Sequence, residues 1–387
     1  MSKRSTIGAY GSWAAKLLGA GPAELSFRHP RFKAGRLAAW RRMALAKARD
    51  LIAAPELPWK PRVRVEKRAE VDGLAVEELS WQLPYGPRTA GRFLEPAGAR
   101  EPLPAILALH DHGGNKFFGL EKISRGAGRQ HPLMRGHQEH YYAGAAWANE
   151  IARRGYAVLV PDAFPFASRR VRYAGVSKCL VGDRREPDPR SAEDIAGYNA
   201  WAAGHEHVMA KSLFCAGTTW PGVFLYEDRR ALDYLCSRPD VDASRVGCGG
   251  LSGGGMRTVF LAGTDPRIRA AVCVGLMTTW RDCLLDKCHT HTWMLYVPRL
   301  AQYLDFPEIL GLRVPSPTMV LNDSGDNLFT LPEMRRADRI LREVYAKAGV
   351  PDRYRCSFHP GPHKFDLPMQ REAFGWFDRW LAAGAGR

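Results

Sequence analysis

The chain has 387 residues, of which 45% are hydrophobic and 25% are charged; these proportions are ordinary for a globular protein and allow one large core. No apolar run reaches the roughly 18 to 20 residues that a membrane-spanning helix needs, and the first residues lack the apolar segment of a secretory signal, so we expect a cytoplasmic protein without a membrane partner. The formal net charge is +16, but residues 1–68 hold 16 Lys and Arg against 4 Asp and Glu. No zinc-finger spacing or RNA-binding aromatic motif accompanies this charge, which argues against a nucleic acid partner.

Cysteine and histidine spacings give little support to a metal site. No two of the eight cysteines form a C-x-x-C pair. Reduced thiols are therefore the expectation, with a disulfide or metal role for Cys283 and Cys288 as the alternative. Three His-x-His pairs lack the spacing of a third zinc ligand, so we expect no metal and no cofactor. These pairs are His110 and His112, His205 and His207, and His289 and His291.

The first sixty residues predict a basic helical extension. Residues 32–52 carry apolar side chains at helical spacing, and a proline-rich hinge at Pro55, Pro58 and Pro61 follows. Residues 1–62 are thus predicted to form an extension that packs across the domain or joins two copies into a homo-oligomer. Residues 63–387 are predicted to form the catalytic domain, which opens with antiparallel strands at Val63–Ala69, Leu74–Leu83 and Gly91–Glu95.

From Leu103 onward, strand and helix patterns alternate. This alternation predicts an α/β fold with a doubly wound, mainly parallel sheet that binds ligands at the carboxyl ends of its strands. Residues 163–220 have no clear period and predict a lid or insertion. The predicted strands are Leu103–His110, Tyr156–Pro161, Arg245–Gly249, Ile268–Leu276, Thr318–Leu321 and Tyr354–Phe358, and the predicted helices are Tyr141–Arg154, Val223–Ser237, Met256–Ala262, Pro332–Ala348 and Met369–Leu381.

The sequence Gly250-Leu251-Ser252-Gly253-Gly254 lies between a predicted strand and a predicted helix. A serine at the centre of G-x-S-x-G in this position is typical of a nucleophile elbow, a turn so tight that its neighbours must be small. A glycine-rich turn without chemistry is the alternative. The lack of a following Gly-Lys-Ser/Thr argues against a phosphate loop.

A serine nucleophile needs a base and an orienting acid, which follow it in the order acid then histidine in this type of fold. His363 follows the last predicted strand and is favoured as the base over His359, which is constrained by the strand and by Pro360. Asp323 and Asp326 both follow the strand Thr318–Leu321. Asp326 is favoured because it lies beyond Gly325, where a turn can direct its carboxylate toward the histidine; both could instead cap the next helix.

An oxyanion hole needs two N–H donors. The first is predicted to be Gly253, the residue after the nucleophile, and the second to come from His112, with Gly113 as the alternative, in the loop His110-Asp111-His112-Gly113-Gly114. Four aromatic residues in and beside the insertion are candidates for the substrate pocket, although they could equally form the core of the lid. They are Trp201, Phe214, Trp220 and Phe224.

Four segments occur in the order and spacing found in the α/β-hydrolase superfamily: His110–Gly114, Gly250–Gly254, Asp326–Thr330 and Gly361–Phe365. Over roughly residues 100–385 the chain resembles the acetyl xylan esterase and dienelactone hydrolase-like branch, which is near the prolyl oligopeptidase-type catalytic domains. Dienelactone hydrolases proper carry a cysteine nucleophile, whereas this position is Ser252. No propeller repeat precedes the domain, which argues against peptidase activity.

The expected function is therefore hydrolysis of carboxylic esters through a Ser252–His363–Asp326 triad and an acyl-enzyme. The expected substrates are acetylated or aromatic-acylated small molecules or sugars. The alternatives are an amidase, peptidase or acyltransferase with the same triad, or a non-catalytic scaffold on the same fold.

Overall fold

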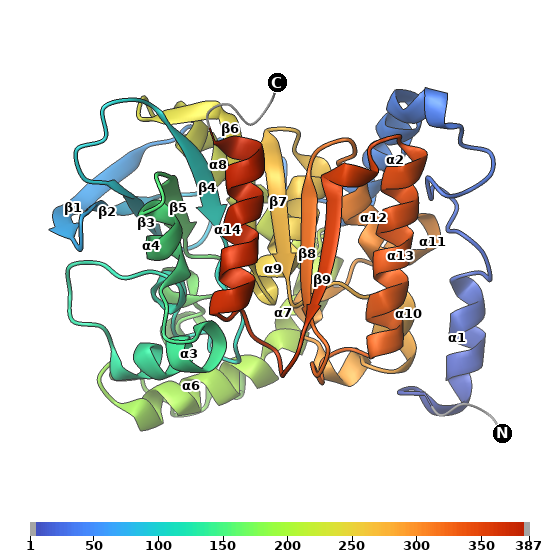
Figure 1. The fold of residues 1–387 in the computed structure, drawn as a ribbon. Coiled ribbons are helices and arrows are strands. Elements are labelled where there is room, and N and C mark those ends of the chain that lie inside the picture. Colours follow the sequence, from blue (N-terminus) through green and yellow to red (C-terminus); the bar gives the residue numbers. More distant parts are fainter. Residues whose placement is uncertain (1–4, 383–387) are drawn as a thin grey trace.

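The computed structural model describes residues 5–382. One nine-stranded sheet runs through the molecule in the order β1-β2-β3-β5-β4-β6-β7-β8-β9 (Figure 1). The strands are β1 Val63–Val71, β2 Leu74–Trp81, β3 Thr89–Pro96, β4 Leu103–Ala108, β5 Ala157–Pro161, β6 Val241–Leu251, β7 Ile268–Val274, β8 Thr318–Asp323 and β9 Tyr354–His359. The pairs from β1 to β3 and the β3–β5 pair are antiparallel. All pairs from β5 to β9 are parallel, which confirms the predicted fold class.

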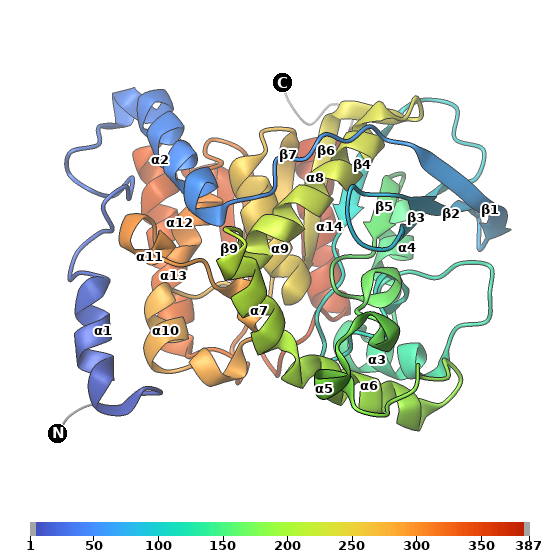
Figure 2. The same ribbon diagram turned by 180° about the vertical axis from the view of Figure 1, so that it is seen from behind.

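Helices cover both faces of this sheet, because successive strand side chains point to opposite sides. Ile106 and Ala108 of β4 pack into the apolar cluster that contains α4 and α14, whereas Ala105 and Leu107 pack into the cluster that contains α2, α8, α9 and α13. Figure 1 shows α4 and α14 in front of the strands, and Figure 2 shows α8 and α9 on the opposite face. The bounds are α2 Leu37–Ile52, α4 Trp147–Ala152, α8 Trp220–Ser237, α9 Gly253–Thr264, α13 Leu331–Lys347 and α14 Leu367–Leu381.

The prediction of a single helix over Tyr141–Arg154 is wrong. The structure has α3 over Pro132–Tyr142 and α4 over Trp147–Ala152. Ala143 and Gly144 both adopt positive φ angles of 53° and 81°, which end α3. No strong breaker other than Gly144 marks this break in the sequence.

The predicted insertion over residues 163–220 is mostly helical. It contains α5 Lys178–Val181, α6 Ala192–Gly204 and α7 Glu206–Cys215, and α6 lies beyond the lower edge of the sheet in Figure 1. A third apolar cluster joins α6 to the segment after β4 through Tyr198 and Phe117. Between β7 and β8 the chain adds the short helices α10 Trp280–Leu285, α11 Leu300–Tyr303 and α12 Phe306–Gly311, for which the sequence pattern gave no prediction.

The basic extension packs on the domain. Its short first helix α1, Gly11–Leu17, contacts α10. Trp40, Ala44, Ala48 and Ile52 form the buried face of α2. The first three belong to the apolar spacing that predicted this helix. The chain then crosses α8 on its way to β1 (Figure 2). The division into two units at residue 62 stays a prediction. Within residues 5–382, no helix combines the length and the apolar character needed to cross a bilayer.

Candidate active site

Ser252 lies at the turn between β6 and α9 with φ 57° and ψ −115°, a conformation that costs free energy for any residue with a side chain. Its neighbours are small because the chain is crowded there. A Cβ atom added to Gly250 or Gly254 would lie 2.1 Å from the Leu109 carbonyl oxygen. The G-x-S-x-G spacing is therefore required by the close approach of β4 to the turn, and it leaves Ser252 partly exposed at the start of α9.

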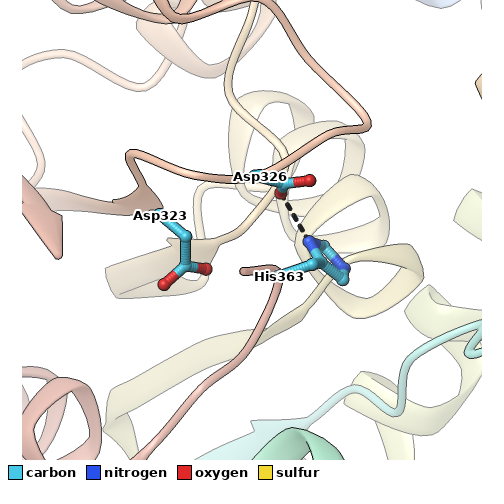
Figure 3. Close-up of side chains that lie close together, drawn as sticks. All are labelled: Asp323, Asp326 and His363. Atoms are coloured by element: carbon cyan, nitrogen blue, oxygen red, sulfur yellow. Dashed lines mark hydrogen bonds and ion pairs between the residues drawn. The ribbon is translucent and has the colours of Figure 1, made fainter. Parts of the chain in front are cut away.

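Asp326 and His363 come together at the carboxyl ends of β8 and β9. The Nδ1 atom of His363 donates to Oδ2 of Asp326 at 2.6 Å (Figure 3). Oδ1 of Asp326 accepts from the Leu328 amide at 2.9 Å. Because the carboxylate fixes the proton on Nδ1, the Nε2 atom of a neutral His363 is free to accept one. This Nε2 is buried and has no hydrogen-bond partner within the described chain.

The two rival residues have other partners. Asp323 Oδ2 accepts from the backbone amide of Lys364 at 3.0 Å, so this carboxyl group holds the loop that carries His363. Burial raises the pKa of Asp323 to about 7. His359 pairs with Glu372 of α14, with 2.9 Å between Nε2 and Oε2. The geometry thus favours the predicted choice of Asp326 and His363 over both alternatives.

Asp323, Asp326 and His363 also meet the distance criterion for a metal site, since one potential ligand atom from each lies within 4.8 Å of the others. Oδ2 of Asp323, Oδ2 of Asp326 and Nδ1 of His363 are engaged in the hydrogen bonds just described, whereas Oδ1 of Asp323 and Nε2 of His363 have no partner within residues 5–382. All eight cysteines are free, so Cys283 and Cys288 form no disulfide with each other.

The backbone amides of Gly253 and His112 lie close to each other, next to Ser252. A Cβ atom added to Gly253 would lie 2.9 Å from the amide nitrogen of His112, so the loop after β4 touches the first residue of α9. The Gly253 amide has no acceptor inside the helix because it belongs to the first turn. Neither the His112 amide nor the Gly113 amide donates to another group within residues 5–382. Of the predicted oxyanion donors, the amides of Gly253 and His112 are thus adjacent, and that of Gly113 belongs to the same loop.

A cavity of about 400 Å³ joins these groups. It is lined by Ser252, His363, His112 and Gly113, and its apolar wall consists of Phe166, Phe224, Met256, Leu276, Met294, Leu295, Leu328 and Phe329. Of the four aromatic residues predicted for the pocket, only Phe224 lines it. The structure places Trp201 against Tyr173 and His205 in the insertion, Phe214 at the margin of the main core, and Trp220 within that core, 1% exposed.

Two ionised side chains that the sequence analysis missed also line the cavity, and each is paired. Glu206 of α7 accepts from Lys116 at 2.6 Å and from Nε2 of His112 at 3.3 Å. Although burial opposes it, these contacts lower the pKa of Glu206 to about 2. Arg257 of α9 donates from Nε to Asp228 at 3.0 Å. Only packing brings Glu206 to Lys116, and no motif joins the two residues in the sequence.

His291 is a further cavity residue. It precedes β8, which carries the acid, so the expected order of acid then histidine does not indicate it as the base. The centre of its ring lies 4.9 Å from that of Phe329, and it is close enough to Asp326 and His363 for their charges to affect its pKa. Burial lowers the pKa of His291 to about 4, so this imidazole is neutral near pH 7. It contributes a polar but uncharged wall beside the Asp326–His363 pair.

No family model matches the chain. It is 27% identical over 322 residues to the Bacillus subtilis (strain 168) protein named "Putative hydrolase YtaP", a match that covers 82% of this chain and 91% of that protein. Among solved structures, a "putative acetyl xylan esterase" from Bacteroides fragilis NCTC 9343 superposes with a TM-score of 0.68 and 19% identity, covering 91% of this chain and 82% of that one.

A glucuronoyl esterase from Solibacter usitatus gives a TM-score of 0.59 at 15% identity, with 89% of this chain and 92% of that chain covered. An acetyl xylan esterase from Paenibacillus sp. R4 gives 0.52 at 17% identity, with 95% and 99% covered. At these identities the likeness shows the fold, which is that of the α/β-hydrolases, as the resemblance of the motifs had implied.

Proposed function

We propose that this protein is a serine hydrolase that cleaves uncharged carboxylic esters through an acyl-enzyme on Ser252. The observation that supports this most is the meeting of the strained Ser252, the Asp326–His363 pair and the free amides of His112 and Gly253 around one cavity. Each group alone has an ordinary structural explanation, but acyl transfer requires all of them together.

In the first half of the proposed reaction, Oγ of Ser252 attacks the ester carbonyl carbon while Nε2 of His363 accepts its proton. Asp326 keeps the other imidazole proton on Nδ1 and stabilises the imidazolium that forms. The carbonyl oxygen becomes an oxyanion and accepts from the amides of Gly253 and of His112 or Gly113. The tetrahedral intermediate then collapses, the C–O bond to the alcohol breaks, and His363 gives its proton to the leaving oxygen.

In the second half, water attacks the acyl-enzyme and His363 takes one of its protons. The same amides bind the second oxyanion. Collapse releases the carboxylic acid, and the proton returns from His363 to Oγ of Ser252. The sequence of steps consumes one ester and one water molecule and needs no other reactant.

The cavity supports an uncharged substrate. Its ionised groups are all paired: Glu206 with Lys116, Arg257 with Asp228 and Asp111 with Lys122. Burial lowers the pKa of His110 and His112, so they carry no charge near pH 7. A carboxylate on the substrate would lose its hydration and would find, as its one unpartnered cationic donor among the described lining residues, Nη1 of Arg257, a guanidinium that Asp228 already neutralises; this exchange is costly. Acetylated or aromatic-acylated small molecules and sugars fit these conditions and the apolar wall.

We propose that the protein acts in the cytoplasm, because all eight of its cysteines are free thiols, as is usual in a reducing compartment.

The test is a panel of p-nitrophenyl esters of increasing acyl length, followed by acetylated and feruloylated sugars. Hydrolysis should be lost in Ser252→Ala, and a fluorophosphonate should label Ser252 in the folded wild-type protein only. Failure of labelling would favour a non-catalytic scaffold. A matched p-nitroanilide that is cleaved faster than its ester would favour an amidase.

The charge preference is tested with p-nitrophenyl butyrate and the mono-p-nitrophenyl ester of succinic acid, which have similar lengths. Because an unpaired buried carboxylate costs several kcal/mol, kcat/KM should be at least about tenfold lower for the charged ester. Equal values for the two esters would contradict the assignment of an uncharged substrate.

A further inference from the structure

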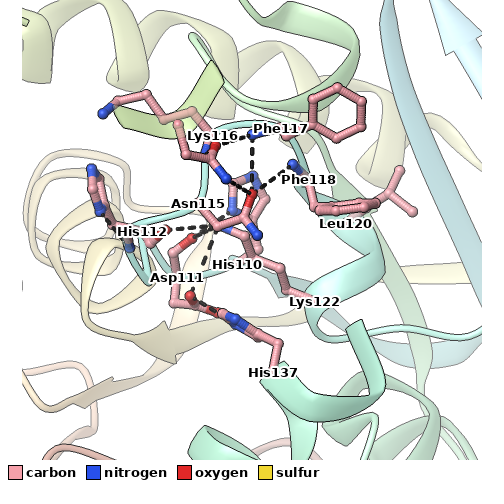
Figure 4. A network of polar contacts seen from close by, with 12 residues as sticks. His110, Asp111, His112, Asn115, Lys116, Phe117, Phe118, Leu120, Lys122 and His137 are labelled. Atoms are coloured by element: carbon pink, nitrogen blue, oxygen red, sulfur yellow. Dashed lines mark hydrogen bonds and ion pairs between the residues drawn. The ribbon is translucent and has the colours of Figure 1, made fainter. Parts of the chain in front are cut away.

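Lys122 is a lysine with no exposed surface, located at the end of the 3-10 turn Leu120–Lys122. Its Nζ atom donates to the carbonyl oxygen of Asp111 at 2.8 Å and to that of His112 at 2.9 Å (Figure 4). It lies 3.9 Å from Oδ2 of the Asp111 side chain. Burying an ammonium group is costly unless it is paired and hydrogen-bonded, so this arrangement calls for an explanation.

The two carbonyl groups belong to the loop that presents the proposed oxyanion donors. The Asp111–His112 and His112–Gly113 peptide bonds are trans, and in a trans peptide the C=O and N–H bonds point in opposite directions. When Lys122 binds both carbonyl oxygens, the amides of His112 and Gly113 must point away from it. The His112 amide nitrogen is the atom that lies next to Gly253, beside the nucleophile.

Lys122 is itself held firmly. The Asp111 carboxylate accepts from Nε2 of His137 at 3.2 Å and from the hydroxyl of Tyr142, and both residues belong to α3. On another side, the Phe166 ring lies 4.7 Å from Nζ. Burial lowers the pKa of Lys122 to about 8, against the opposing effect of Asp111, so the ammonium form still prevails at neutral pH.

We infer that Lys122 is a positioning residue of the oxyanion hole, which fixes the direction of the His112 and Gly113 amides by binding the carbonyl groups of the same peptide planes. The inference rests on the proposed ester hydrolysis. The positive charge of Lys122 at the carbonyl end of each peptide group also polarises the N–H end, which strengthens the hydrogen bond to a developing oxyanion.

The expected effect falls on the transition state. In Lys122→Met, which has similar length and no donor, kcat should fall about 10²-fold, the cost of one misdirected oxyanion donor, while KM changes little. Lys122→Gln retains a neutral donor and should recover part of the loss. A boronic acid that forms a tetrahedral adduct on Ser252 should bind more weakly by the same factor as kcat/KM falls, whereas binding of the uncharged product alcohol should stay unchanged.

Lys347→Met is the matched control. Its Nζ atom also donates to two backbone carbonyls, those of Phe27 and His29, and lies over an aromatic ring, but this site joins α13 to the extension. Its kcat should equal that of the wild type. Thermal unfolding of every variant separates loss of fold from loss of rate.

If Lys122→Met does not fold, the double variant Asp111→Asn/Lys122→Gln takes its place in the comparison, because it removes both charges of the pair together. A wild-type kcat with boronate affinity unchanged in a folded Lys122 variant would overturn the inference. Lack of any ester hydrolysis by the wild-type protein would instead refute the proposed function.

Discussion

Replacing Asp326 by Asn separates the proposed acid from its neighbour. Asp326 accepts from Nδ1 of His363 through Oδ2 and from the Leu328 amide through Oδ1. An asparagine can satisfy the Leu328 amide only with its single oxygen, which turns its NH₂ group toward His363. The imidazole would then carry its proton on Nε2, where it cannot accept the proton of Ser252.

The size of the effect follows from this wrong tautomer. Such a substitution in a serine–histidine–aspartate relay lowers kcat by about 10⁴-fold, which corresponds to about 5 kcal/mol of transition-state stabilisation. Asp323→Asn is the matched control. Its amide oxygen can still accept from the Lys364 amide, as Oδ2 of Asp323 does at 3.0 Å, so we expect less than about a tenfold loss.

The assay is steady-state hydrolysis of p-nitrophenyl acetate by both variants and the wild type, with thermal unfolding as the check on folding. A greater loss in Asp323→Asn than in Asp326→Asn, with both variants folded, would refute the assignment of the acid. It would show that the loop rearranges so that Asp323 reaches the imidazole.

Three further predictions concern stability. Ser252→Gly should raise the free energy of unfolding by about 1–3 kcal/mol, because it relieves the positive φ, while turnover is lost; a fall in stability would contradict the strain. Burial raises the pKa of Glu308 to about 7, so the folded state retains a proton that the unfolded state loses. The free energy of unfolding should therefore fall by up to about 3 kcal/mol as pH rises from about 4 to 8. Denaturant titrations of Glu308→Gln, whose amide oxygen can still accept from the Ser26 hydroxyl, should show a shallower fall. Trp40→Ala should cost about 3–5 kcal/mol, because a side chain only 2% exposed is removed from the core; calorimetry would measure it, and a loss below 1 kcal/mol would contradict the packing of the extension.

The sequence predicted those parts of the site that depend on local geometry. The glycines around Ser252 are needed because the chain directly after β4 passes so close to the turn. The proposed triad needs an acid and a histidine from the loops after β8 and β9, which lie at the same edge of the sheet. These requirements leave a fixed spacing of residue types, which can be read without a structure.

What the sequence could not predict depends on contacts between distant segments. Glu206 meets Lys116 only because α7 folds over the loop after β4, and Lys122 reaches the carbonyl groups of Asp111 and His112 only through a turn with no motif of its own. The pocket aromatics were misplaced for the same reason. Trp220, which precedes Phe224 by about one helical turn, points into the core rather than the cavity.

The extension crosses α8 and is hydrogen-bonded to the residues at the start of this helix. The hydroxyls of Thr219 and Thr218 donate to the carbonyl oxygens of Ile52 and Ala53, and a Cβ atom on Gly222 would lie 2.4 Å from the former. About half a turn beyond Gly222 on the same helix, Phe224 lines the cavity. We therefore expect that exchanging the extension, residues 1–62, between related enzymes would change which esters are accepted, although none of its described residues lines the cavity.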